Sequence, residues 1–210
     1  MIKRLLDRFR RDRGLHKATV RVDFYANDLV YPSIQWHRSQ DPQNDTVPLM
    51  VLLYAQILYE LAELNKVQVA RQLMEFVEQV CQRLTVPGEE PLRRLRLPLG
   101  QLQYCPEAPM APAVRTYQAE FYQLQGGNYR LDFRGSLGKE ELYLPGAYLT
   151  LLQFCLNELG DEPIRNLVQG LGRLHLYYRY RRDFWEGSSL SAGPAFALGS
   201  EELRPEEVIK

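Results

Sequence analysis

Two stretches of the chain alternate apolar and polar side chains. The first covers residues 20–24 and the second covers residues 117–121. Alternation with a period of two places the apolar set on one face of a β-strand. Turn-forming residues follow each stretch, around Asn27-Asp28 and around residues 125–128, and a returning apolar stretch comes after each turn. The pattern therefore predicts two β-hairpins.

Two predicted helices follow each hairpin. Residues 49–64 and 148–159 are apolar nearly all round, which is typical of helices enclosed by the rest of a protein. Pro48 and Pro145 stand just before them, and proline is favoured at the first position of a helix because the amide hydrogen it lacks would have no partner there. We expect each proline to begin its helix.

The second helix of each pair has an apolar stripe on one face. In residues 67–81 and again in residues 164–178, large or small apolar side chains recur every three or four positions. Such amphipathic helices cover a core on one side and face water on the other. We expect them to pack on the two apolar helices.

The two halves align with each other. When the sequence is shifted by 97 positions, residues 19–81 align without a gap with residues 116–178. The period of hydrophobicity changes at the same places in both segments, as a duplicated unit requires. The predicted fold class is α+β, a tandem pseudo-duplicated unit of a β-hairpin and a two-helix hairpin that share one core.

The chain divides into five predicted parts. They are a basic amphipathic N-terminal helix at 1–16, repeat unit 1 at 17–85, a Pro-rich linker at 86–112, repeat unit 2 at 113–186 and a flexible tail at 187–210. The first 17 residues carry seven Lys or Arg and two Asp side chains. Their helix either packs its apolar side on the body or binds an anionic membrane or a nucleic acid.

Composition narrows the class of protein. The 210 residues carry 26 basic and 26 acidic side chains, so the net charge is zero. No charge-free stretch reaches the roughly 20 residues that span a bilayer, so no transmembrane segment is expected. Three cysteines far apart in the chain favour reduced thiols, and we expect a cytoplasmic protein.

A second basic segment combines cations with aromatic side chains. Guanidinium groups neutralise phosphates and aromatic rings stack on unpaired bases, so this composition suits single-stranded nucleic acid as well as a protein partner. The candidate binding residues are Arg173, Arg179, Tyr180, Arg181, Arg182 and Trp185.

Gln56 and Gln153 occupy equivalent positions in the two apolar helices. A buried amide without partners costs roughly 1 to 3 kcal/mol, so both should be satisfied. We expect a pseudo-symmetric pair between the repeats, each amide bonding the other or a nearby backbone group. The alternative is a pair that binds a small ligand in a pocket between the halves.

The sequence lacks a recognisable catalytic motif. His16, His37 and His175 are its three histidines, and none stands at metal-ligand spacing with a cysteine, so no metal and no cofactor are expected. His37 with Asp41 or Asp45 forms the one candidate acid–base pair. These observations disfavour an enzyme without excluding one.

The predicted function is a non-catalytic protein–protein interaction or assembly protein, because Tyr, Trp and Arg are enriched at interfaces and are frequent near the ends of this chain. A protein partner or a homodimer is expected. The first alternative is a nucleic-acid-binding module that uses residues 173–185. The second is a small-ligand-binding protein or enzyme with a pocket between the two halves.

Overall fold

A computed structural model describes residues 14–85, 101–134 and 143–180. The strands are β1 (Leu15–Phe24), β2 (Leu29–Trp36), β3 (Gln103–Tyr104), β4 (Arg115–Gln123) and β5 (Tyr129–Arg134). The helices are α2 (Pro42–Glu63), α3 (Val67–Thr85), α4 (Tyr143–Glu158) and α5 (Asp161–Tyr180), and a short 3-10 turn, η2, covers Gln125–Gly127.

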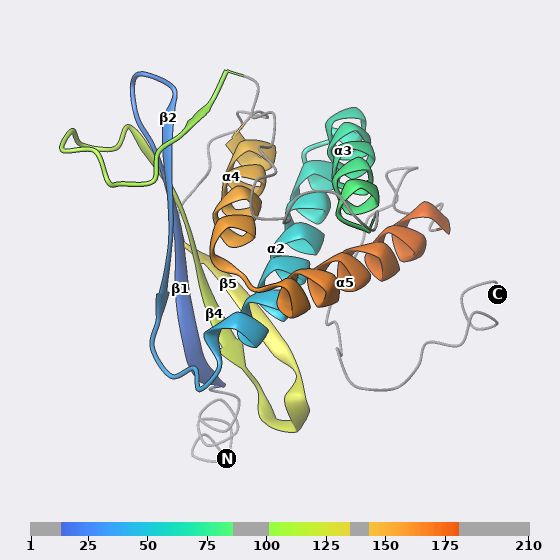
Figure 1. The fold of residues 1–210 in the computed structure, drawn as a ribbon. Coiled ribbons are helices and arrows are strands. Elements are labelled where there is room, and N and C mark those ends of the chain that lie inside the picture. The colour runs from blue at the N-terminus through green and yellow to red at the C-terminus, as the bar shows by residue number, and fades with distance from the viewer. Residues whose placement is uncertain (1–13, 86–100, 135–142, 181–210) are drawn as a thin grey trace, which may run out of the picture.

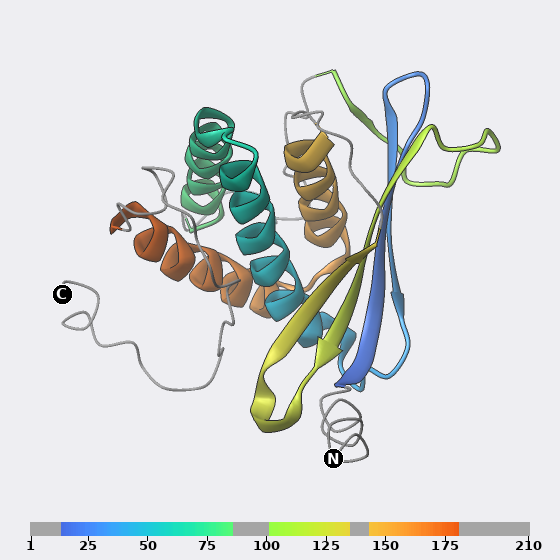
Figure 2. The same cartoon turned by 180° about the vertical axis from the view of Figure 1, so that it is seen from behind.

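The strands form one mixed sheet in the order β3-β2-β1-β4-β5. The pairs β1–β2, β1–β4 and β4–β5 are antiparallel, and β3 runs parallel to β2. Figures 1 and 2 show α2, α3, α4 and α5 together on one side of this sheet. The predicted α+β class is therefore confirmed, and the sheet has a second face that none of the described helices covers.

Alternate side chains of the two central strands, β1 and β4, point toward the helices and form the core with them. Val20, Val22 and Phe24 of β1 are at most 2% exposed, and so are Ala119 and Phe121 of the adjacent β4. Their alternate neighbours point to the other face, as the period-two pattern predicted. The strand, strand, helix, helix order occurs twice along the described chain, interrupted by β3.

The buried faces of the helices follow their patterns, but one predicted contact is wrong. Helix α5 packs mainly on α2 and α3, and not on α4, the apolar helix of its own half. Helix α2 contacts α3, α4 and α5, and its side chains Tyr54 and Ile57 are fully buried. The stripe of α5, which includes Ile164, Leu167 and Leu171, is also buried. Helix α2 is long and apolar enough to cross a membrane by length and composition, yet 61% of its most apolar window is buried within the protein. Such burial is typical of a core helix.

The predicted start of the first apolar helix is wrong. Helix α2 begins at Pro42, with Asp41 as its N-cap, and Pro48 lies inside it. The Asp41 side chain accepts hydrogen bonds from the backbone and the side chain of Asn44. These bonds satisfy a free donor of the first turn, and Pro42 takes the early helical position that the sequence pattern predicts for Pro48. The cap therefore decides where this helix starts.

Pro145 lies in the first turn of α4, which begins at Tyr143. Proline costs little in a first turn, because the amide hydrogen that it lacks has no partner within the helix there. The prediction that Pro145 is the first residue of the helix is wrong by two residues. The preceding residues, 135–142, lie outside the described residues.

The two predicted hairpin turns are present. Gly126 and Gly127 have φ values of 84° and 82°, a region that glycine adopts without steric cost. Asp28, in the first turn, has a φ of 57°. Aspartate tolerates this left-handed conformation better than most residues because its short side chain can hydrogen-bond locally.

The Pro-rich linker and the ends are partly described. From residue 101 onward the linker runs beside β2, and Gln103–Tyr104 pair with it as β3. The first 13 residues and residues 181–210 lie outside the described residues. Strand β1 already begins at Leu15, so the end of the segment assigned to an N-terminal helix, Leu15 and His16, is strand.

Candidate functional site

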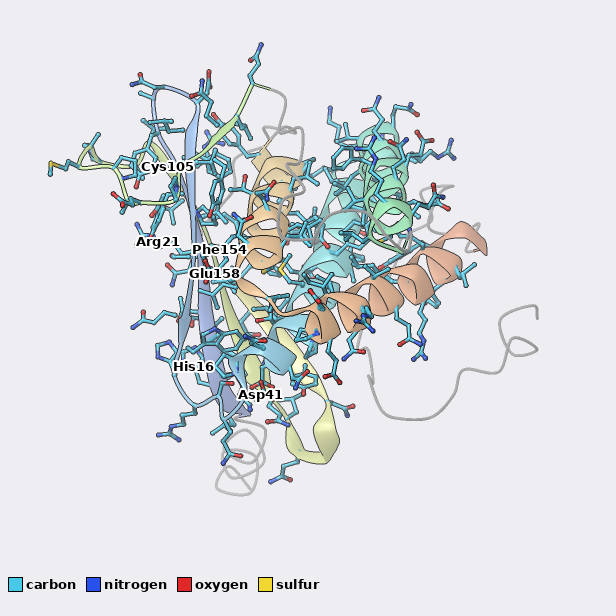
Figure 3. All side chains as sticks on the ribbon, in the orientation of Figure 1. His16, Arg21, Asp41, Cys105, Phe154 and Glu158 are labelled. Carbon is cyan, nitrogen blue, oxygen red and sulfur yellow. The ribbon has the colours of Figure 1, made fainter. Side chains whose placement is uncertain are left out.

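The face of the sheet away from the helices, here called the open face, carries the candidate site. Cross-strand partners share a face of a sheet, so the strand register defines this surface. In Figure 3, His16 and Arg21 lie on the side of β1 away from the helices. The open face presents His16, Thr19, Arg21 and Asp23 from β1, Tyr31, Ser33 and Gln35 from β2, Thr116, Gln118, Glu120 and Tyr122 from β4, and Arg130 and Asp132 from β5.

Glu120 is the centre of a hydrogen-bond network, although it lies on a face without helices. Its side chain is 6% exposed because neighbouring side chains cover it. The Thr19 hydroxyl donates to Oε2 at 2.7 Å, and the Gln118 amide donates to Oε1 at 3.0 Å. His16 Nε2 lies 2.7 Å from Oε2. We call these four residues, with His37, the Glu120 cluster.

These contacts affect the ionisation of Glu120. Burial by itself would raise its pKa, but the hydrogen bonds from Thr19, Gln118 and His16, together with the charge of His16, lower the pKa below its ordinary value. The carboxylate therefore stays ionised at neutral pH and acts only as an acceptor.

Asp23 has a matching set of contacts. The Thr116 hydroxyl donates to its Oδ1 from the neighbouring strand. Arg21 Nε, two residues earlier on the same strand, lies 2.9 Å from Oδ1 and 2.8 Å from Oδ2. Each buried carboxylate thus accepts two kinds of hydrogen bond. One comes from a threonine hydroxyl on the neighbouring strand, and the other comes from the side chain two residues earlier on its own strand. The two sets correspond under the shift of 97 positions.

The directions of the hydrogen bonds at the Glu120 cluster can be assigned. Thr19 has one hydroxyl hydrogen, and it is used on Glu120. His37 Nε2, 2.9 Å from Thr19 Oγ1, must then be the donor of that contact. His16 Nε2 must likewise donate, because the ionised carboxylate only accepts. Both imidazoles therefore direct an Nε2–H toward Glu120, one of them through Thr19.

The two histidine rings also contact each other. Their centroids are 4.4 Å apart, and the ring of Tyr122 stacks on His16 at 4.9 Å. Arg130 lies over the ring of Tyr122, with its guanidinium carbon 4.9 Å from the ring centroid. Packing from several strands fixes the orientation of both imidazoles.

The two halves differ at the end of the sheet that carries His16 and His37, here called the histidine end. The position equivalent to His16 is Ala113, whose methyl side chain cannot donate to Asp23 in the way that His16 donates to Glu120. An open hollow of about 660 Å³ lies at this end. We call it the histidine depression, and its lining is Gly14, Leu15, His16, His37, Arg38, Gln123, Leu124 and Gln125.

The predicted acid–base pair of His37 with Asp41 or Asp45 is replaced by other contacts. His37 bonds Thr19, Asp41 caps α2, and Asp45 accepts from Lys17 Nζ at 2.9 Å and from Ser39 at 2.6 Å. The sequence contained one signal for the true arrangement, since Thr19 and Thr116 stand at equivalent positions. It gave no sign that Glu120 would be buried, because the strand pairing that brings His16 to it joins residues more than 100 positions apart.

Of the predicted binding residues on the last helix, the structure describes the side chain of Arg173, which is exposed on α5. Leu174 and Tyr178, on the neighbouring face, are buried as expected. The side chains of Arg179 and Tyr180, and the whole of Arg181, Arg182 and Trp185, lie outside the described residues. Nucleic-acid binding at this segment stays a prediction.

Gln56 and Gln153 each bond a side chain one turn further along their own helix. Gln56 Nε2 lies 3.4 Å from Oε1 of Glu60, and Gln153 Nε2 lies 3.1 Å from Oδ1 of Asn157. Both amides thus have a local partner. Neither residue lines the histidine depression or a second, smaller hollow that lies between α3 and α5. Their predicted pairing across the repeats stays a prediction.

The hollow between α3 and α5 has a volume of about 230 Å³. Its lining includes Cys81 and His175, and His175 Nε2 is 2.7 Å from the hydroxyl of Tyr54. Burial raises the pKa of the Cys81 thiol to about 11, with a smaller contribution from the charge of Glu78. The thiol is therefore protonated and a poor nucleophile at neutral pH.

Among residues 14–85, 101–134 and 143–180, no group of three or more His, Cys, Asp and Glu side chains is arranged to hold a metal ion. A comparison of the chain with protein-family models, with curated proteins and with solved structures finds no match. The open face with its histidine depression is therefore a candidate site on geometric grounds alone.

Proposed function

We propose that this protein is a non-catalytic interaction or assembly protein that docks a protein partner on the open face of its sheet. The observation that supports this most is the Glu120 cluster, in which a carboxylate on a helix-free face is 6% exposed and held by Thr19, Gln118 and His16. Burying a charged group is costly unless its hydrogen bonds are satisfied. Here three donors satisfy it, which fixes the surrounding side chains.

Such a fixed surface favours binding. Side chains that are held before a partner arrives lose less conformational entropy on association. Tyr and Arg, which the open face presents at Tyr31, Tyr122, Arg21 and Arg130, are also the residue types enriched at protein interfaces. A polar surface with aromatic members fits a reversible partner better than a permanent one.

The test is a matched pair of Gln→Arg substitutions. Gln35 is exposed on the open face of β2, where it lies opposite Thr19, and Gln72 is exposed on α3. Proteins that co-purify with the wild type and with Gln72→Arg from the native cell, but not with Gln35→Arg, would support docking on the open face. Equal capture by all three forms would contradict it, and thermal melting of the two variants controls for folding.

We also propose that the two halves descend from one duplicated unit. The repeated strand, strand, helix, helix order and the matching contacts of Asp23 and Glu120 support this. On this proposal the carboxylate contacts are inherited scaffold, whereas His16 and His37 are later additions at one end. Specific binding would then reside at the histidine end.

The same proposal includes a reducing, cytoplasmic location. Cys81, Cys105 and Cys155 are free thiols in the structure. Two of them are buried, where oxidants reach them slowly. Disulfide formation is not needed to hold this core.

A further inference from the structure

We propose that the histidine depression binds carboxylate side chains of an acidic segment in the protein partner. This inference rests on the proposed function, because it names the chemistry of the partner that the open face would dock. The donors of the depression, the charges around it and the extent of positive surface all support it.

The depression offers hydrogen-bond donors without lining carboxylates. His16, His37 and Arg38 bring two imidazoles and a guanidinium, and Gln123 and Gln125 bring amides. Both imidazoles use Nε2 inside the Glu120 cluster. Their Nδ1 atoms form no hydrogen bond within the part of the chain that the structure describes, and in the charged form of each ring Nδ1 carries a hydrogen that a carboxylate can accept.

The nearby acidic groups already have partners. Glu120 accepts three hydrogen bonds, Asp45 accepts from Lys17 and Ser39, and Asp41 accepts from Asn44. Asp132 pairs with Arg130 at 3.0 Å. Among the described residues, Arg38 has no carboxylate partner within ion-pair distance. An anion at this depression would therefore add a partner to Arg38 without displacing an existing ion pair.

The positive region is small, which favours a carboxylate over a nucleic acid. Phosphate backbones are bound by an extended basic groove or patch. The described open face instead alternates signs, with Arg21 beside Asp23 and Arg130 beside Asp132. One or two side-chain carboxylates match the depression, whereas a continuous line of phosphates would meet Asp23 and Asp132.

The three histidines allow a direct test by nuclear magnetic resonance. A short oligoglutamate peptide is titrated into the full chain at pH 6.5, and the imidazole C–H resonances are followed. The expected result is a saturable shift of the His16 and His37 signals with no shift of His175, which is bonded to Tyr54. These two residues belong to α5 and α2, and both helices lie on the other side of the sheet (Figure 1). Equal shifts of all three signals, or none, would overturn the inference.

Matched arginine variants extend the test. Arg38→Ala should weaken peptide binding about threefold or more, the size of one exposed ion pair, while Arg165→Ala on α5 should leave it unchanged. Binding that survives Arg38→Ala but disappears when residues 1–12 are removed would assign it to the upstream basic segment and overturn the inference. Tighter binding of a thymidine oligonucleotide than of the peptide would also overturn it.

Different results would contradict docking on the open face and carboxylate binding at the histidine depression. If the peptide does not bind but capture still depends on Gln35, the acidic partner is wrong and docking on the open face stands. If the peptide binds the depression but capture is the same for Gln35→Arg and Gln72→Arg, the anion site stands and docking on the open face fails.

Discussion

Arg21 and Gln118 lie directly opposite each other at the centre of the β1–β4 pair, and they are 97 residues apart. This separation equals the offset that aligns the two halves, so each residue faces its own equivalent. The same offset relates the two neighbouring pairs to each other. Thr19 pairs with Glu120, and their equivalents, Thr116 and Asp23, pair with each other. The register therefore has the form of a local two-fold axis through the sheet.

The first prediction follows from this relationship. Thr19→Val and Thr116→Val each remove one hydroxyl donor to a buried carboxylate and keep the β-branched shape that a strand favours. Each should lower the free energy of unfolding by about 1 kcal/mol. Urea denaturation followed by circular dichroism measures both.

The double variant provides the control for this prediction. The two hydroxyls bond different carboxylates, so the losses should add within about 0.5 kcal/mol. If one substitution is silent while the other is costly, the two contacts are not equivalent, and the symmetric account of the sheet is wrong.

The second prediction concerns acid stability. The folded-state pKa of Glu120 is lowered, so its contribution to stability is present above the ordinary glutamate pKa and is lost as pH falls through the lower folded value. Wild-type stability should therefore decline more steeply than that of Glu120→Gln as pH falls from about 5 to 3. Chemical denaturation at several pH values measures the two slopes, and parallel curves would contradict the assignment.

Much of the fold could be predicted because it depends on local periodicity. The alternation at residues 20–24 and 117–121 and the apolar stripes of α3 and α5 reflect burial, which the sequence records directly. The first residues of the helices were harder to predict from the sequence. Pro48 resembled a first helical residue, but Asp41 and Pro42 supplied a better cap and start six residues earlier.

The candidate site could not be predicted in the same way. His16 precedes the alternating stretch and was assigned to a helix, yet its partner Glu120 lies on a strand 104 residues away. The side chains of the open face are polar, so periodicity marks them as solvated and says nothing of their contacts. Only the register between β1 and β4 shows that Thr19, His16 and Gln118 converge on one carboxylate.

The third prediction compares two stacked tyrosines in the core. The rings of Tyr54 and Tyr148 are 4.9 Å apart, and both side chains are fully buried. The hydroxyl of Tyr54 bonds His175, whereas that of Tyr148 has no partner within the described part of the chain. A buried unpaired hydroxyl is unfavourable, while a buried bonded one is favourable.

Tyr54→Phe should therefore lower the free energy of unfolding by about 1 kcal/mol, and Tyr148→Phe should leave it unchanged or raise it. Both substitutions keep the stacked ring, so each serves as the control for the other. Equal losses would show that the Tyr148 hydroxyl has a partner in solution, such as a bound water.

The last prediction tests the close backbone approach at Gly14, which lines the histidine depression. A Cβ on Gly14 would lie 2.7 Å from the carbonyl oxygen of Gln123 and 2.7 Å from Cδ2 of Leu124, which is closer than side chains approach backbone atoms. Because the Gln123 carbonyl belongs to β4, the start of β1 would have to move. Gly14→Ala should cost about 1 kcal/mol of stability and speed amide hydrogen exchange at this end of the β1–β4 pair.

Gly172→Ala is the matched control, because a Cβ there meets open space on α5. Alanine is the better helix former, so this variant should gain up to about 1 kcal/mol. The two glycines thus predict opposite signs for one chemical change. A stability gain for Gly14→Ala would mean that the close approach at Gln123 is absent. The arrangement of Gly14 and Gln123 in the lining of the histidine depression would then be wrong.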